Sequence, residues 1–337
     1  MLGITLGEFL RFLVQFGFAV AGATSLWGFV LLMKARTHPE EKDSFHKIAK
    51  LVGKLFFVGI SVFLTGWWTV NVFILTPTAA AHEGIKLAPT LETIKNGFAI
   101  NQYFVLMIMA ILLVYLILKA SKNWVFEKHA AILFGLNFIL LSVIAVFSVF
   151  TGKFDGNQLF FFLHHWHSIF TLGTVITVDF LYTTVRDINL KRTLYSFFPI
   201  MSVVIWTGLG LDFLSISLIY EQAISLTQQF YFIQTVVAII IINGSLLSGK
   251  INDLLTNSVK PGGQALAPRT LRLMGISGSV SIVSWLTITF VDFFKLTLNY
   301  PQLALIYVTA IVTAYFVHDV IEKMIEKSAT AREVRVS

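Results

Sequence analysis

The chain consists of long apolar segments separated by shorter polar ones. Apolar runs of roughly 20 residues, the length an α-helix needs to cross a bilayer, are separated by short polar connections. We therefore expect an all-α protein that forms a multi-pass bundle of transmembrane helices. The nine expected spans are 8–34, 51–75, 98–118, 129–150, 159–185, 196–219, 225–247, 272–295 and 300–318.

The polar connections differ in charge from one side of the expected bundle to the other. Twenty of the 25 Lys and Arg residues fall on one side, counting the segment after the last span. Cytoplasmic connections carry the excess of Lys and Arg in membrane proteins. The N-terminus is therefore expected outside and the C-terminus in the cytoplasm. The expected location is a cell membrane, the inner membrane of a prokaryote, with the lipid bilayer as the main partner.

Composition supports the same class and excludes several others. The chain has 337 residues, of which 56% are hydrophobic and 13% charged, whereas soluble domains are about 25% charged. It contains no cysteine, so disulfides and thiolate metal sites within the chain are excluded. No polar stretch is long enough for a nucleic-acid-binding domain. The inner connection 248–271 contains Pro261, Gly262, Gly263 and Pro268, which predict a turn-rich linker rather than a helix.

The chain contains a candidate internal repeat. A shift of 142 residues places the first span on the fifth and the second on the sixth, with Thr65 and Gly66 on Thr207 and Gly208. Both halves start outside, so the repeat would be parallel, in a 4+4+1 arrangement; chance similarity between apolar helices is the alternative. The expected organisation is a first four-helix unit (1–150), a second one carrying the site (151–298), and a ninth helix with its tail (299–337).

The fifth span carries most of its polar residues on one face. At 100° per residue these residues fall within an arc of about 120°. They are His164, His167, Ser168, Thr171, Asp179, Tyr182 and Arg186, with His165 on the flank. A polar stripe in a transmembrane helix faces protein or a water-filled cavity rather than lipid.

Matching heights across the predicted hairpins brings further polar residues to the level of the histidines. Asp212 lies within one residue of the height of His167, and Asp292 shares the height of Gln228. Imidazole nitrogens and carboxylate oxygens are competent ligands for transition metals. The candidate metal ligands are His164, His165, His167 and Asp212, with His167 also the candidate haem ligand. The candidate supporting or relay residues are Asp179, Asp292, Thr171, Tyr182, Arg186 and Gln228.

Two other interpretations of the same residues stay open. The histidine cluster could be an interfacial anchor at a helix entrance, with the aspartates hydrogen-bonded to Ser and Thr. Alternatively, Asp179 could continue a proton path to the inner side, in which case a partner from another helix or a bridging water is expected. His129 and His318 lie at similar height at inner helix ends and could pair, although histidines in such positions usually reach the membrane interface.

Several short motifs resemble a family of bacterial membrane proteins. The segment from Leu163-His164 through Gly173 to Asp179 is followed by a basic turn and a helix with Trp206-Thr207-Gly208. The later spans contain Asn243-Gly244 and Ile276-Ser277-Gly278. Residues 160–295 resemble CopD-like copper-resistance proteins and related uncharacterised families, and this resemblance implies copper as the cargo.

The leading expectation for function is a site in the outer leaflet for a transition metal, with copper favoured, or for haem b. It would serve metal handling, transport or a redox reaction, and whether the protein is an enzyme stays open. One alternative is a non-catalytic subunit of a larger membrane complex or a homo-oligomer. The other is a proton-coupled transporter that uses the polar stripe of the fifth span.

Overall fold

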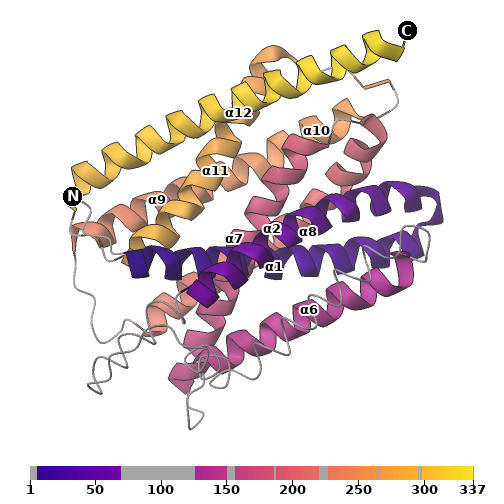
Figure 1. Cartoon of the computed structure of the whole chain (residues 1–337). Helices are drawn as coiled ribbons and strands as arrows, with labels where there is room; N and C mark the ends of the chain where they lie inside the picture. Colours follow the sequence, from indigo (N-terminus) through magenta and orange to yellow (C-terminus); the bar gives the residue numbers. More distant parts are fainter. Residues whose placement is uncertain are drawn as a thin grey trace. The chain divides into compact units, whose positions relative to one another are not determined.

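The structure is a computed structural model that describes residues 6–69, 126–149, 156–185, 187–219, 227–260, 262–263, 266–294, 296 and 298–336. Every regular element within these ranges is a helix (Figure 1), which confirms the expected all-α class. The long helices are α1 (Leu6–Thr37), α2 (Lys42–Thr69), α6 (Phe126–Val149), α7 (Gly156–Thr184), α8 (Ile188–Ile219), α9 (Gln228–Leu246), α11 (Pro268–Phe294) and α12 (Tyr300–Val336). The short ones are a 3₁₀ turn (Pro39–Glu41), a π-helical turn (Leu247–Ile251) and α10 (Asn252–Ser258).

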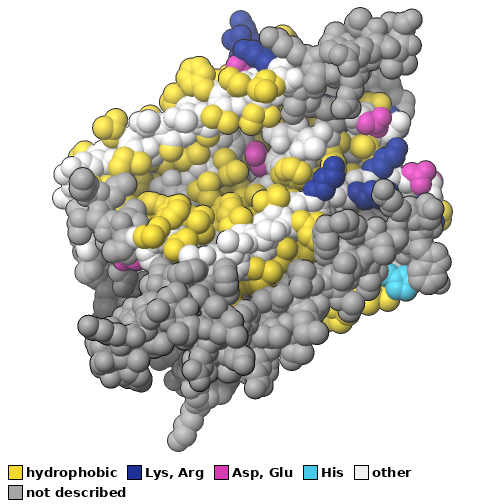
Figure 2. All heavy atoms as spheres, viewed as in Figure 1, with side chains coloured by type: hydrophobic (Ala, Val, Ile, Leu, Met, Phe, Trp, Pro, Cys, Tyr) yellow, Lys and Arg dark blue, Asp and Glu magenta, His cyan; other side chains and the backbone are white. Residues whose placement is uncertain are grey.

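Six helical stretches in the described ranges are long and apolar enough to cross a membrane. They are Leu6–Thr37, Pro39–Trp67, Ile188–Leu211, Gln228–Ser258, Pro268–Val291 and Tyr300–Ile321. Figure 2 shows hydrophobic side chains over the middle of the helices in view, with charged side chains mostly near their ends. Helices with this distribution of side chains are suited to contact the lipid bilayer.

Most of the expected spans coincide with long helices of the structure. Eight of the nine overlap a long helix, while the expected span 98–118 lies outside the described residues. The count of nine spans and the parallel repeat therefore stay predictions. The organisation into units 1–150, 151–298 and 299–337 also stays a prediction.

The connection 248–271, which was expected on the inner side, is more helical than its prolines and glycines predict. From α9 the chain continues through the π-helical turn and α10 as far as Ser258. Residues 247–258 contain no proline, and the side chains of Ile251 and Leu255 are buried. The turn chemistry begins only afterwards, where Gly262 adopts the left-handed conformation with φ +76° that glycine tolerates.

Helix α12 also continues beyond its expected end. The apolar pattern predicts a span over 300–318 followed by a tail, whereas the helix runs from Tyr300 to Val336, 37 residues in all. A hydropathy pattern identifies only the part of a helix that is suited to lipid. The pattern therefore ends where the polar residues begin, although the helix itself continues. One side-chain pair in this extension is an ion pair between Lys323 and Asp319, with Nζ and Oδ2 2.7 Å apart.

The chain divides into two compact units by its contacts. The N-terminal unit comprises Ile4–Thr177 and Val204–Gln222, and thus α1, α2, α6, the first part of α7 and the second part of α8. The C-terminal unit comprises Val178–Val203 and Ala223–Ser337, and thus the remainder of α7 and α8 together with α9 to α12.

Close approach of helix backbones organises the N-terminal unit around α1. A Cβ added to Gly59 of α2 would lie 2.7 Å from the backbone nitrogen of Ala21. A Cβ added to Gly173 of α7 would lie 2.6 Å from Cβ of Ala23. Both glycines thus let a neighbouring helix pack directly on the centre of α1, which is buried on all sides. Small residues at helix contacts serve this purpose in membrane bundles, where van der Waals packing drives association.

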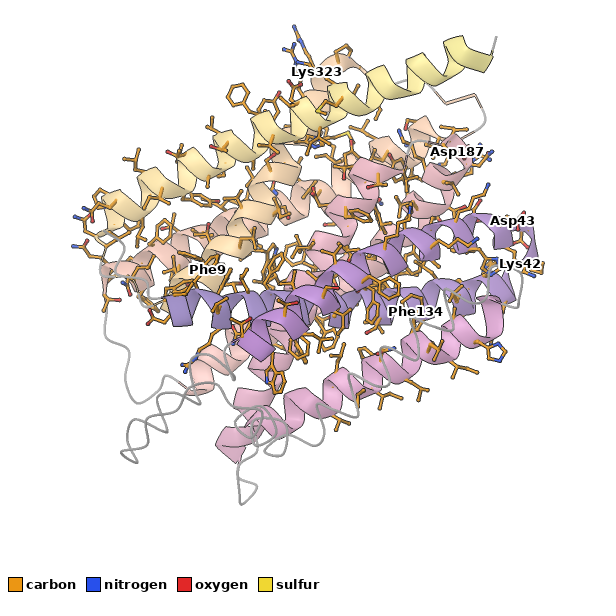
Figure 3. The ribbon with its side chains drawn as sticks, in the orientation of Figure 1. Phe9, Lys42, Asp43, Phe134, Asp187 and Lys323 are labelled. Atoms are coloured by element: carbon orange, nitrogen blue, oxygen red, sulfur yellow. The ribbon has the colours of Figure 1, made fainter. Side chains whose placement is uncertain are left out.

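Specific hydrogen bonds fix the start of α8 and the end of α10 in the C-terminal unit. Asp187 caps α8, because its Oδ1 accepts hydrogen bonds from the backbone nitrogens of Asn189 (2.9 Å) and Leu190 (3.0 Å); Figure 3 labels this residue. Arg192 of α8 donates from Nε to the backbone oxygen of Val259, 3.0 Å away, just after α10 ends. The α8 start is thereby tied to the connection before α11.

Candidate functional site

The structure places the predicted metal ligands on helices but does not describe their side chains. His164, His165 and His167 lie in α7, and Asp212 lies in α8. Asp292 lies in α11 and its side chain is likewise outside the described residues, as is the whole of Arg186. Within the described part of the chain, no group of three His, Asp or Glu side chains comes together as metal ligands. The copper or haem site therefore stays a prediction.

The part of α7 that follows the histidines is enclosed by protein. Every residue from Phe170 to Thr177 is buried, and Thr171 and Thr174 are fully so. Apolar residues of the same turns, such as Leu172 and Val175, are buried as well. The polar stripe thus does not separate a protein-facing side from a lipid-facing side here, since a helix that is buried all round has no lipid-facing side.

Asp179 lies at the other end of the stripe, in the C-terminal unit, with its side chain half-buried. Its carboxylate faces α11, where a Cβ added to Gly278 would lie 3.5 Å from Oδ1. It interacts electrostatically with His318 of α12. Among the described residues, no hydrogen bond reaches its carboxylate oxygens, while its backbone oxygen accepts one from Thr183 Oγ1 (2.9 Å).

His318 contacts the same stretch of α11 one turn away. A Cβ added to Gly275 would lie 3.3 Å from Cδ2 and 3.6 Å from Nε2 of His318. The same Cβ would lie 3.5 Å from the ring of Tyr315. Gly275 and Gly278 are three residues apart and therefore neighbours on the helix surface. They form a glycine floor on α11, which faces Asp179 of α7 at Gly278 and His318 of α12 at Gly275.

A buried amide fixes the same turn of α11 from a third helix. Nδ2 of Asn243 in α9 donates a hydrogen bond to the backbone oxygen of Ser277, 2.8 Å away. Asn243 and Ser277 are both buried. The segment Gly275–Gly278 of α11 is thus contacted by α7, α9 and α12. Tyr182 follows Asp179 by three residues on α7 and is half-buried.

Two tyrosines of α12 make the same kind of hydrogen bond to neighbouring helices. The Tyr307 hydroxyl lies 2.7 Å from Ser284 Oγ of α11, and this Oγ donates to the backbone oxygen of Val280 (2.5 Å). The Tyr300 hydroxyl donates to Thr235 Oγ1 of α9 (3.1 Å). In turn, Thr235 donates to a backbone oxygen of its own helix. Each tyrosine thereby joins α12 to a hydroxyl that is already bonded to its own helix.

Gln228, expected at the height of Asp292, has a structural contact at the start of α12. Its Oε1 accepts a hydrogen bond from the backbone nitrogen of Tyr300, 2.9 Å away. The first turn of α9 is capped by Thr227, whose Oγ1 accepts from the backbone nitrogen of Phe230 (3.2 Å). The beginnings of α9 and α12 are therefore held side by side.

His318 is the residue of this region that the sequence interpretation overlooked. It was expected at an inner helix end, as an interfacial residue or as a partner of His129, but not as a partner of Asp179. The signal that identifies it is its register on α12, because Tyr300, Tyr307 and His318 lie within about 20° of one line along the helix. The hydrogen bonds of Tyr300 and Tyr307 show that this line faces α9 and α11, so His318 also faces the protein.

The fold and these contacts define the class of the molecule as an all-helical integral membrane protein. No family model, curated protein or solved structure matches the chain. The resemblance of residues 160–295 to CopD-like proteins therefore stays a prediction.

Proposed function

We propose that this protein moves protons across the membrane, with Asp179 as the proton-binding group and His318 as its partner. The observation that carries the proposal is that the two side chains lie against neighbouring glycines of α11 and interact electrostatically. Asp179 belongs to the fifth expected span, and His318 of α12 belongs to the ninth. The groups therefore lie on two helices that would cross the bilayer.

The cost of keeping such groups in a membrane supports a functional role. An ionisable side chain within a bilayer costs on the order of 3 kcal/mol, so such residues are retained mainly for ion or proton pathways. A carboxylate without hydrogen bonds from described residues can take up a proton and become neutral. A neighbouring imidazole can hold or release a proton within the physiological pH range. The pair can thus change its total charge by one while the helices stay packed.

The glycine floor supports the same role by leaving space beside the carboxylate. An alanine at Gly278 would place its methyl group in van der Waals contact with Oδ1 of Asp179. With hydrogen in that position, a water molecule can approach both Asp179 and His318. Water between the two groups would carry a proton from one to the other without direct contact.

Proton flux into liposomes tests the proposal. The purified protein is reconstituted with a pH-sensitive dye inside, and a potassium diffusion potential drives proton entry. Asp179→Asn is expected to abolish the flux, and His318→Gln is expected to reduce it. Asp319→Asn is the matched control, because Asp319 lies next to His318 on α12 but forms an ion pair with the exposed Lys323 at the end of the apolar stretch. Equal flux in the unmodified protein and in Asp179→Asn would overturn the proposal.

A spectroscopic measurement separates proton binding from folding. Infrared difference spectra between low and high pH are expected to contain the carboxylic-acid band of a protein carboxyl group. This band should be missing in Asp179→Asn and shifted in Asp179→Glu. An unchanged band in Asp179→Asn would show that another carboxyl group binds the proton, and would also contradict the proposal.

A further inference from the structure

We propose that Phe232, Tyr307 and Ser284 form a closure between the outer surface and Asp179, so that Asp179 exchanges protons with the inner side in this conformation. The three residues come from α9, α12 and α11, and all three are buried. This inference rests on the proposed proton-binding role of Asp179. It adds which residues decide the side of the membrane from which that group is reached.

Aromatic packing is the first element of the closure. The ring of Phe232 lies between those of Tyr300 and Tyr307, with centroid distances of 5.9 Å and 6.0 Å. Both contacts are nearly perpendicular, at 82° and 83°, which is the favourable edge-to-face arrangement. Phe232 is 2% exposed, so the space between α9 and α12 is filled at this level.

The hydroxyl groups at this level are engaged locally and do not lead on towards Asp179. Ser284 Oγ donates its only hydrogen to the backbone oxygen of Val280, so Tyr307 is the donor in the bond between the two hydroxyls. Neither hydroxyl retains a hydrogen that points to the next turn of the bundle. The Tyr307–Ser284 pair therefore acts as a link between α11 and α12 rather than as a proton relay.

The candidate proton-binding pair lies well below this level and near the inner helix ends. Eleven residues separate Tyr307 from His318, a rise of about 16 Å along α12. Asp179 lies five residues before the end of α7 at Thr184, about 8 Å from that end. Asp179 and His318 are both half-buried, in contrast to the buried residues of the closure. The other titratable groups nearby are Tyr182 on α7, Tyr315 on α12 and Arg272 on α11, which lies one turn before Gly275.

Cysteine labelling tests the closure directly, because the natural chain has no cysteine and gives no background. The reporter is Gly278→Cys, whose Cβ would lie 3.5 Å from Oδ1 of Asp179. A charged, membrane-impermeant thiol reagent is applied to right-side-out or to inverted membrane vesicles. We expect fast labelling from the inner side and slow labelling from the outer side.

Variants of the closure should change the outer labelling rate selectively. Phe232→Ala is expected to raise it about tenfold, the factor that ~1.4 kcal/mol of lost closure would give. Tyr307→Phe keeps the ring and removes the link to Ser284. It should raise the rate about threefold, matching the ~0.6 kcal/mol average for a hydrogen bond between membrane helices. Phe316→Ala is the matched control, since Phe316 lies on the same helix but is 60% exposed.

Each outcome bears on the closure without depending on transport. Outer labelling that is fast in the reporter alone, or unchanged by both closure variants, would overturn the inference. If only Phe232→Ala misfolds, Tyr307→Phe still gives the result. Loss of proton flux in Asp179→Asn together with unchanged outer labelling would remove the closure and leave the proposed function standing. Raised outer labelling in a protein whose flux does not depend on Asp179 would remove the proton pathway and with it the role proposed for the closure.

Discussion

Nε1 of Trp27 donates a hydrogen bond to Oγ1 of Thr174, 3.0 Å away, and so joins α1 to α7 in the buried centre of the N-terminal unit. Both side chains are almost completely buried. An indole N–H that is buried needs a partner, and here the partner comes from a residue 147 positions away in the sequence. This bond fixes the register of α7 on α1 close to the contact between Gly173 and Ala23.

Trp27→Phe should therefore lower the stability of the protein measurably. The variant loses the hydrogen bond, leaves a buried hydroxyl without its donor and opens a small cavity. We expect the free energy of unfolding to fall by about 2 kcal/mol, the sum of a lost hydrogen bond and an unsatisfied buried group. Unfolding in detergent would measure it. In the cycle with Thr174→Val, the double variant should lose less than the two single variants together; additive losses would show that the bond contributes nothing.

Substitution of two glycines by alanine should have effects of opposite sign. Gly59→Ala forces a methyl group against the backbone of α1, within 2.7 Å of the nitrogen of Ala21. Overpacking of this kind costs about 1–3 kcal/mol. Gly210 of α8 is exposed and a Cβ there has no neighbour within 4 Å, so Gly210→Ala should stabilise the helix by about 0.5–1 kcal/mol.

Apparent melting temperatures in detergent distinguish these two variants. Gly59→Ala is expected to melt below the unmodified protein and Gly210→Ala at or above it. A rise in melting temperature for Gly59→Ala would mean that α1 and α2 are not in backbone contact in the folded protein.

Asn243→Ala should destabilise the contact between α9 and α11. The variant leaves the backbone oxygen of Ser277 without its donor from Asn243, and such interhelical bonds contribute about 0.6 kcal/mol on average and up to ~1.7 kcal/mol. The expected loss of stability is in this range. Asn257→Ala is the control, because Asn257 accepts an exposed hydrogen bond from Lys260 (2.8 Å) whose loss should not alter the melting temperature. Equal effects of the two substitutions would contradict a special role for Asn243.

Metal and haem analysis tests the outer-leaflet site predicted from the sequence. If His164, His167 and Asp212 bind copper, the purified protein should contain the metal in stoichiometric amount and lose it in His167→Ala. If they bind haem, an absorption spectrum should contain a Soret band that His167→Ala removes. His38→Ala is the control, because His38 belongs to the connection between α1 and α2 and contacts Thr37 (2.9 Å). A colourless protein without bound metal would show that the prediction is wrong.

The sequence was most informative where a property depends on one helix alone. The all-α class follows from the lengths of the apolar runs, and eight expected spans fall on long helices. Helix boundaries were less accurate, because hydropathy reports contact with lipid rather than the helical conformation. The second span was expected from residue 51, whereas α2 begins at Lys42 and includes a polar first part. The helical residues 248–258 were missed for the same reason.

Properties that depend on two helices were harder to predict. Apolar residues such as Leu172 and Val175 of α7 are suited to face either lipid or protein. The hydropathy pattern therefore does not show that this segment is buried by protein. The sequence indicated that Asp179 needs a partner, but His318 lies 139 positions further on and belongs to the last span. Its register with Tyr300 and Tyr307 was available as a signal. A hydropathy pattern also does not show that two glycines of α11 face these residues.

The length of α12 gives the last helix a mechanical property. Its 37 residues form a rod of about 55 Å, whereas the hydrocarbon layer is about 30 Å thick. Some 25 Å of continuous helix therefore projects beyond the apolar stretch that carries Tyr307 and His318. A tilt of about 10° within the membrane would displace the far tip by roughly 4 Å. A change of tilt caused at the closure or at His318 would thus move the protruding end of α12.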